Sequence, residues 1–173
     1  MGGEKSKAAR FESEALPHSR SLLSTALRLT KNSKDAEDIV QDALLSAWKS
    51  FHTFQPGTNC KAWLFRILLN KYNRRYAALK RAPETLSLEQ DLPLDALVHQ
   101  PSVATFARSE IFAAVDALPI EFRTVVILGI VEGFTCREIA EMQELPLGTV
   151  MSRLSRGRQR LRENLANAAV KKS

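Results

Sequence analysis

Apolar residues recur at helical spacing through the first half of the chain, and this pattern predicts three helices there. The first is expected over residues 18–30 and the second, which is the clearest, over residues 34–51. The third is expected over residues 59–82. The second helix carries a continuous apolar stripe, formed by Val40, Ala43, Leu44, Ala47, Trp48 and Phe51. We therefore expect this helix to pack along one face.

The second half of the chain predicts about four more helices. Residues 106–118 are amphipathic, and Pro119 opens a strongly apolar segment that Gly133 ends. Two shorter segments follow within residues 135–158. Between the halves, residues 83–104 contain three prolines and few large apolar side chains, which predicts a linker. The expected fold class is therefore all-α, with two small helical domains joined by a flexible linker.

Residues 135–158 have the pattern of two short helices with a tight turn between them. Thr135 can cap the first helix, and Glu138 completes a Thr-x-x-Glu capping box. Pro146 suits the first turn of the second helix, whose apolar stripe is Val150, Leu154, Leu161 and Leu165. Polar side chains lie opposite that stripe: Ser152, Arg153, Ser155, Arg156 and Arg160. The pattern predicts a helix-turn-helix with its second helix suited to the major groove.

The charge distribution supports nucleic-acid binding. The formal net charge is +6, and residues 52–83 contain seven basic residues and no acid. Residues 146–173 hold five Arg and two Lys against one Glu, whereas residues 84–95 carry four acids and no base. An arginine-rich helix can be only a solvated face. Its coincidence here with the capping box, the proline and the apolar stripe favours a two-module DNA-binding protein.

Two further features of the first half are candidate binding sites. Asp35, Asp38 and Asp42 align on one flank of the second helix, where they form either a solvated helix start or an acidic docking strip. The loop over residues 52–59 is polar with aromatic tips and precedes a basic helix, which suits unpaired bases. Trp63 is expected in the core.

No catalytic constellation is found in the sequence, and the chain is not expected to be an enzyme. Cys60 and Cys136 are too few for a metal cluster, so we expect buried or incidental thiols and no metal site. No apolar run approaches the length of a membrane span. Residues 1–10 are polar and charged, and we expect them to be disordered. The expected location is the cytoplasm.

The chain resembles the extracytoplasmic-function (ECF, group IV) sigma factors of bacterial RNA polymerase. In the first half the resemblance rests on Asp35-Ala36-Glu37-Asp38-Ile39-Val40-Gln41-Asp42, Trp48, Phe51, Phe54 and Ala62-Trp63-Leu64-Phe65-Arg66-Ile67. In the second half it rests on Leu118-Pro119, Phe122-Arg123, Glu132-Gly133-Phe134-Thr135, Glu138-Ile139-Ala140-Glu141 and Gly148-Thr149-Val150, with Ser152-Arg153-Leu154 and Arg156-Gly157-Arg158. The motifs cover nearly the whole chain outside the tail and the linker.

The resemblance implies sigma region 2 over residues 11–82, the linker over 83–104 and sigma region 4 over 105–173. It implies core RNA polymerase as a partner, contacted at the coiled coil of its largest subunit and at its flap. Promoter DNA and an anti-sigma factor are the other implied partners, with no cofactor, small-molecule substrate or membrane insertion. Asp38, Gln41 and Asp42 match the positions that dock on the coiled coil, which favours the docking strip over the solvated helix start.

The resemblance also implies which residues contact the promoter. The loop 52–59 matches the one that captures a flipped base of the −10 element, and the residues expected for binding and melting there are His52, Thr53, Phe54, Asn59, Lys61, Arg66, Asn70, Asn73 and Arg74. The residues expected at the −35 element are Thr149, Ser152, Arg153, Ser155 and Arg156. Thr149 is expected on a phosphate, and the arginines can pair with guanine.

Two departures from the family pattern concern the −35 element. Gln143-Glu144 replaces the usual Leu-Gly of the turn, and loss of a glycine that tolerates positive φ is expected to strain it. Met151 stands where a basic residue is common. Two other functions are open: a sigma-like decoy that only binds an anti-sigma protein, or a one-component repressor. The retained Arg74, Arg153 and Arg156 favour a working sigma factor over the decoy, and the acidic strip disfavours the repressor.

Overall fold

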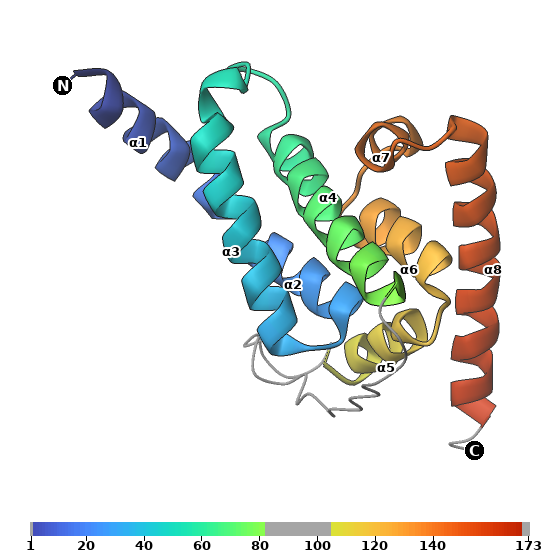
Figure 1. Ribbon diagram of the computed structural model, residues 1–173. Coiled ribbons are helices and arrows are strands. Elements are labelled where there is room, and N and C mark those ends of the chain that lie inside the picture. Colours follow the sequence, from blue (N-terminus) through green and yellow to red (C-terminus); the bar gives the residue numbers. More distant parts are fainter. Residues whose placement is uncertain (1, 82–104, 171–173) are drawn as a thin grey trace. The chain divides into compact units, whose positions relative to one another are not determined.

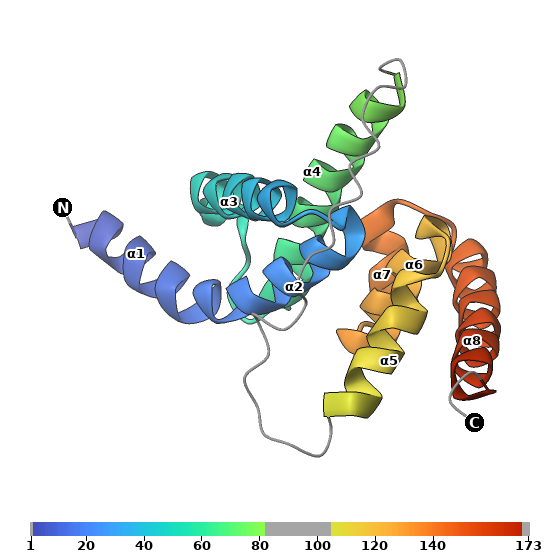
Figure 2. The ribbon, with the colours of Figure 1, turned by 90° about the horizontal axis from the view of Figure 1, so that it is seen from below.

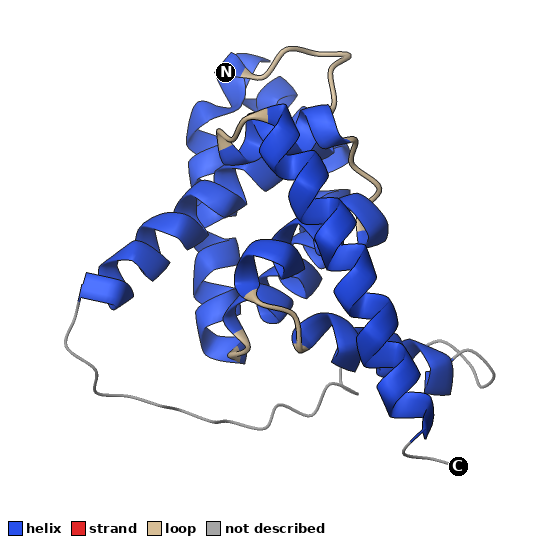
Figure 3. Ribbon diagram, turned by 90° about the vertical axis from the view of Figure 1, so that its right-hand side faces the viewer, coloured by secondary structure: helices blue, strands red, loops and turns tan. Residues whose placement is uncertain are grey.

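The computed structural model describes residues 2–81 and 105–170, and every regular element among them is a helix (Figure 3). The predicted all-α class is confirmed. The chain forms two compact units, of which the first contains α1 to α4 and the second, for the most part, α5 to α8. The predicted linker, residues 83–104, lies outside the described residues.

The first unit is built on three helices that pack against one another (Figure 1). They are α2, Ser19–Thr30; α3, Ser33–Ser50; and α4, Cys60–Arg81. These are the three helices that the apolar spacing predicts, with bounds that agree to within one or two residues. Asn32 caps α3, its side-chain oxygen accepting a hydrogen bond from the Asp35 backbone N–H at 3.0 Å. Leu22 of α2 and Phe65 of α4 are fully buried in the core.

The prediction that residues 1–10 are disordered is wrong for residues 2–10. They belong to a helix, α1, that spans Gly2–Glu14 and leads through a short 3₁₀ helix, Leu16–His18, into α2 (Figure 2). The physical reason is Phe11, which is only 7% exposed although α1 is otherwise polar. Burial of one large aromatic side chain contributes about 2–3 kcal/mol to the stability of the helix on the core. A single buried residue, however, gives the sequence no helical period.

The second unit contains α5, Thr105–Asp116; α6, Ile120–Val126; a π-helical turn, Ile127–Val131; α7, Cys136–Gln143; and α8, Leu147–Val170. These are the four helices expected after the linker. Buried Arg123 of α6 donates hydrogen bonds from Nε and Nη2 to the Leu118 carbonyl, at 3.2 and 2.8 Å. These bonds satisfy a backbone carbonyl that follows the end of α5. Gly157 lets α8 approach α6 closely, because a Cβ there would lie 2.7 Å from Val126 Cγ2.

The turn between α7 and α8 forces a glutamate into a conformation that favours glycine. Glu144 has φ 54°, and the Leu145 N–H donates to the Ala140 carbonyl at 3.0 Å. This is a Schellman motif, whose left-handed position is usually glycine. The strain expected from the Gln143-Glu144 departure is therefore located at Glu144. The helix-turn-helix tolerates the substitution at an energetic cost.

We predict that Glu144→Gly stabilises the α7–α8 turn by about 1 kcal/mol, because glycine removes the Cβ penalty of positive φ but loses more entropy on folding. The measurement is urea unfolding of the full chain followed by far-UV circular dichroism. Both tryptophans, Trp48 and Trp63, lie in the first unit. They belong to α3 and α4, which do not contain the substituted residue, so their fluorescence transition should shift less than the circular dichroism transition.

The matched control is Glu144→Ala, which removes the carboxylate but keeps the Cβ. It should leave the circular dichroism transition close to that of the parent. If alanine and glycine stabilise the protein equally, the effect comes from the lost charge and the conformational explanation is wrong.

Candidate nucleic-acid and protein-binding surfaces

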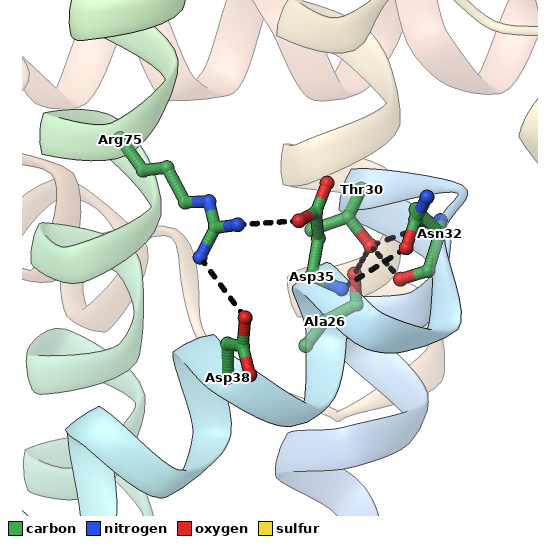
Figure 4. Close-up of polar contacts among 6 residues, drawn as sticks. All are labelled: Ala26, Thr30, Asn32, Asp35, Asp38 and Arg75. Atoms are coloured by element: carbon green, nitrogen blue, oxygen red, sulfur yellow. Dashed lines mark hydrogen bonds and ion pairs between the residues drawn. The ribbon is translucent and has the colours of Figure 1, made fainter. Parts of the chain in front are cut away.

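The acidic strip lies on the exposed side of α3. Asp38, Gln41 and Asp42 are all exposed and recur at three- and four-residue spacing, so they share one helical face. Asp38 is also ion-paired within the protein, its Oδ2 lying 3.7 Å from Nη1 of Arg75 on α4. Nη2 of the same arginine donates to Oδ1 of Asp35 (Figure 4). Arg75 thus offsets negative charge at the start of the strip, whereas the rest of the strip is formed by Gln41 and Asp42.

Short-range hydrogen bonds shape the loop 52–59. Its first part is a 3₁₀ turn, Phe51–Thr53, in which the Thr53 hydroxyl donates to the Ser50 carbonyl at 2.7 Å. Nδ1 of His52 lies 3.2 Å from the Lys49 carbonyl oxygen. At the other end, Asn59 caps α4 by accepting a hydrogen bond from the Ala62 N–H at 3.0 Å. His52, Thr53 and Asn59 are exposed, as contacts to unpaired DNA would require.

Phe54 lies in the interior and not at the loop surface, which contradicts its predicted place against DNA. It is 5% exposed and stacks on Phe51, with ring centroids 5.6 Å apart and an interplanar angle of 18°. On its other side the Trp63 ring lies at 5.3 Å. An aromatic side chain with such partners gains more from burial than from exposure at a loop tip. Trp63, expected in the core, is half-buried.

The basic and amide side chains of α4 divide between two faces. Arg66, Asn70 and Asn73 recur at four- and three-residue spacing on one face, with Arg74 at its edge. Arg66, Asn73 and Arg74 are exposed, and Asn70 is half-buried. Lys61 lies on another face of the helix, where its Nζ is 5.7 Å from the Phe65 ring centroid. The structure therefore brings four of the five predicted α4 residues together and separates Lys61 from them.

The capping box of the helix-turn-helix is formed as the sequence predicts. The Thr135 N–H donates to Glu138 Oε2 at 2.8 Å, and the Glu138 N–H donates to Thr135 Oγ1 at 3.2 Å. This reciprocal pair fixes where α7 begins. Of the predicted apolar stripe of α8, Val150 is fully buried and Leu154 is 8% exposed, whereas Leu161 and Leu165 are half-buried.

The polar side chains of α8 share one face near its start. Thr149, Arg153 and Arg156 recur at four- and three-residue spacing, with Ser152 beside them and Ser155 one position further round. Ser152, Ser155 and Arg156 are exposed, and Thr149 and Arg153 are half-buried. The Ser152 hydroxyl donates to the Thr149 carbonyl at 3.0 Å, which leaves its oxygen to accept.

Sequence reasoning missed Phe11 and Arg75. Phe11 stands alone in a polar segment, and Arg75 pairs with carboxylates on a different helix. The signal that could have found Arg75 is its place in a basic block, 52–83, that follows the acidic residues of 35–42, which indicates opposite charges but no geometry.

Cys60 is a buried thiol, as expected. Burial, and then the negative charge of Glu14, raises the pKa of the Cys60 thiol above its ordinary value. Within residues 2–81 and 105–170, no group of three or more His, Cys, Asp and Glu side chains could hold a metal ion. The helices in the same ranges include none with the length and hydropathy of a membrane span.

Two matches to known families cover most of the chain. Residues 16–82 match the family described as Sigma-70 region 2, and residues 108–161 match the family described as Sigma-70, region 4. Among solved structures, the chain is similar to the sigma factor RpoE from Bartonella quintana, crystallised with the anti-sigma factor NepR. The TM-score is 0.69 and the identity 28%, covering 90% of this chain and 96% of that one. CnrH, solved with the cytosolic domain of CnrY, gives a TM-score of 0.63 at 25% identity, covering 92% of this chain and 90% of that one.

Curated relatives carry the same family name. The chain is 32% identical to the ECF RNA polymerase sigma factor SigE of Mycolicibacterium smegmatis, over 95% of this chain and 65% of that longer protein. It is 35% identical to the ECF RNA polymerase sigma factor EcfG of Rhodopseudomonas palustris, over 82% of this chain and 77% of that protein. Given both helical regions and these identities, the chain belongs to the ECF RNA polymerase sigma factors.

Proposed function

We propose that this ECF sigma factor binds core RNA polymerase through α3, recognises −35 and −10 promoter elements through α8 and α4, and starts transcription of a specific regulon. The observation that carries the proposal is that each matched region exposes most of the polar residues that the family resemblance assigns to it. Asp42 lies on the open side of α3, and Arg156 on the open side of α8. The chain acts in the cytoplasm, where the polymerase is, and contributes no catalytic step of its own.

The core-binding strip is centred on Gln41 and Asp42. Arg75 already offsets the charge of Asp38, so a basic partner must compete with that arginine for Asp38 but not for Asp42. The partner is the coiled coil of the largest polymerase subunit, with the flap as a second contact for region 4.

The −10 element binds between the loop tips and one face of α4. His52 and Thr53 hold the unpaired base, and Arg66, Asn73 and Arg74 hold the backbone of the adjacent DNA. Phe54 supports this surface from the interior. At the −35 element, Thr149 contacts a phosphate. The base edges of that element are read by Ser152, Arg153, Ser155 and Arg156.

An anti-sigma protein is a further proposed partner. The similar chain RpoE was solved in complex with the anti-sigma factor NepR. This supports an anti-sigma protein as the regulator of this chain. It would act by covering the core-binding and promoter-binding surfaces described here.

The test of the proposed function is run-off transcription with sigma-free core polymerase, this protein and fragmented genomic DNA of the source bacterium, with sequencing of the RNA 5′ ends. Start sites that share a spaced −35 and −10 pair are expected. Binding to core without any RNA would show that promoter engagement fails. If the protein does not bind core at all, it is a decoy and the proposal is wrong.

We predict that Asp42→Lys weakens core binding by roughly a hundredfold, because a like-charge contact costs several kcal/mol. The measurement is fluorescence anisotropy of labelled protein titrated with core polymerase. The matched control is Glu37→Lys, the same charge reversal at an exposed position of α3 on a different flank. If both variants lose the same affinity for core polymerase, the loss comes from the change in net charge and the docking assignment is wrong.

We predict that Arg153→Ala costs about 1–3 kcal/mol at one base pair of the −35 element and relaxes selectivity there. The measurement is binding of the polymerase holoenzyme to a set of promoters that each carry one substitution in that element. Arg162→Ala is the control, because Arg162 is an exposed arginine nine residues further along α8, on the opposite face. Uniformly weaker binding to every promoter, as for a phosphate contact, would contradict base reading by Arg153.

A further inference from the structure

A polar helix holds the aromatic cluster beneath the loop 52–59. Phe11 is the only large apolar residue of α1, and its ring packs edge-on against two others. The ring centroids of Phe11 and Trp48 are 5.3 Å apart, with an interplanar angle of 83°. The centroid of Phe51 lies at 5.2 Å and 85°. Both arrangements are the edge-to-face contacts that aromatic pairs prefer.

Two cations of α1 lie on the same pair of rings. Nζ of Lys7 is 4.4 Å from the centroid of Trp48, and the Arg10 guanidinium carbon is 5.3 Å from that of Phe51. Lys7, Arg10 and Phe11 are spaced by three and four residues, so one face of α1 carries all three contacts. Arg10 is held in turn by Glu14, at 3.0 Å. The helix is therefore fixed on Trp48 and Phe51 by three neighbouring side chains.

The same contacts continue into the loop. Phe51 opens the 3₁₀ turn and stacks on Phe54, which lies against Trp63 of α4. Between these two buried phenylalanines stand His52 and Thr53, both exposed. Because Phe51 and Phe54 are anchored inside, the two residues between them are turned outward. The orientation of the loop tip thus depends on Phe51, and Phe51 is covered by Phe11.

We propose that Phe11 is a positioning residue for the −10 loop: α1 locks Phe51 and Phe54 and so pre-shapes the loop tip for the unpaired promoter strand. The proposal rests on the proposed function, which assigns that strand to His52 and Thr53. A helix that merely stabilised the unit would affect all of its binding surfaces in proportion. The positioning role instead predicts a selective defect in capture of the unpaired strand.

The experiment compares Phe11→Ala and Phe11→Leu in reconstituted holoenzyme. The probe is a fork-junction DNA, duplex through the −35 element and single-stranded on the non-template strand of the −10 element, taken from a promoter identified by run-off transcription. Phe11→Ala should weaken fork binding about tenfold, the value of one lost base-stacking contact. Phe11→Leu, which keeps the apolar volume but loses the edge contacts, should give a smaller loss and covers the case in which the alanine variant does not fold. Affinity for core and for a −35 duplex should stay unchanged.

Two further variants separate the possible failures. Leu16→Ala removes a 42% exposed apolar side chain just after α1 and should leave fork binding unchanged. His52→Ala tests the loop itself. If His52→Ala weakens fork binding and folded Phe11 variants do not, the positioning role is wrong and the loop assignment stands. If neither weakens it, the loop does not hold the −10 strand and both proposals fail. Equal losses by the Phe11 variants in fork, core and −35 duplex binding would mean a general stability effect and overturn the positioning role.

Discussion

Aromatic packing at one end of α3 and α4 is the interaction on which the shape of the loop 52–59 depends. The loop's own hydrogen bonds are short-range and exposed, and such bonds contribute only about 0.5–1.5 kcal/mol each. The aromatic side chains beneath it form a chain of contacts from Phe11 through Phe51 and Phe54 to Trp63. Each such pair is worth about 0.5–1.5 kcal/mol beyond its area burial. The loop is therefore shaped from below, by a cluster in which Phe11, Phe51 and Phe54 are buried.

Neighbouring arginines on α4 serve different purposes because helical geometry turns them to different faces. Arg74 is exposed at the edge of the face that carries Asn70 and Asn73, whereas Arg75 pairs with Asp35 and Asp38 of α3. The acidic partners are 36% and 49% exposed, and ion pairs at that exposure are worth about 0–1 kcal/mol. Arg75 therefore adds little to the packing of α3 on α4. Its main effect is local: it reduces the negative charge at one end of the acidic strip and leaves Asp42 as the more available carboxylate.

The sequence alone predicted what depends on local pattern. The main helices, the capping box at Thr135 and the strained position in the α7–α8 turn follow from spacing and from the conformational preferences of single residues. It did not predict α1, because one phenylalanine in a polar segment produces no period. It also placed Phe54 at the loop surface, since the burial of a loop aromatic depends on partners from other elements. These are tertiary contacts, and no local rule specifies them.

The arginine face of α8 is divided by what lies next to each side chain. Arg153, Arg156 and Arg160 recur on one face, so spacing alone would present all three to DNA. The Arg160 guanidinium, however, lies 4.8 Å from the centroid of the Phe122 ring, on α6, the helix that α8 approaches closely at Gly157. A cation held over an aromatic face gives up contact energy if it turns away toward a phosphate. Under the proposed function, the part of α8 available to read DNA is its first turns, up to Arg156, and the turns beyond them pack on α6.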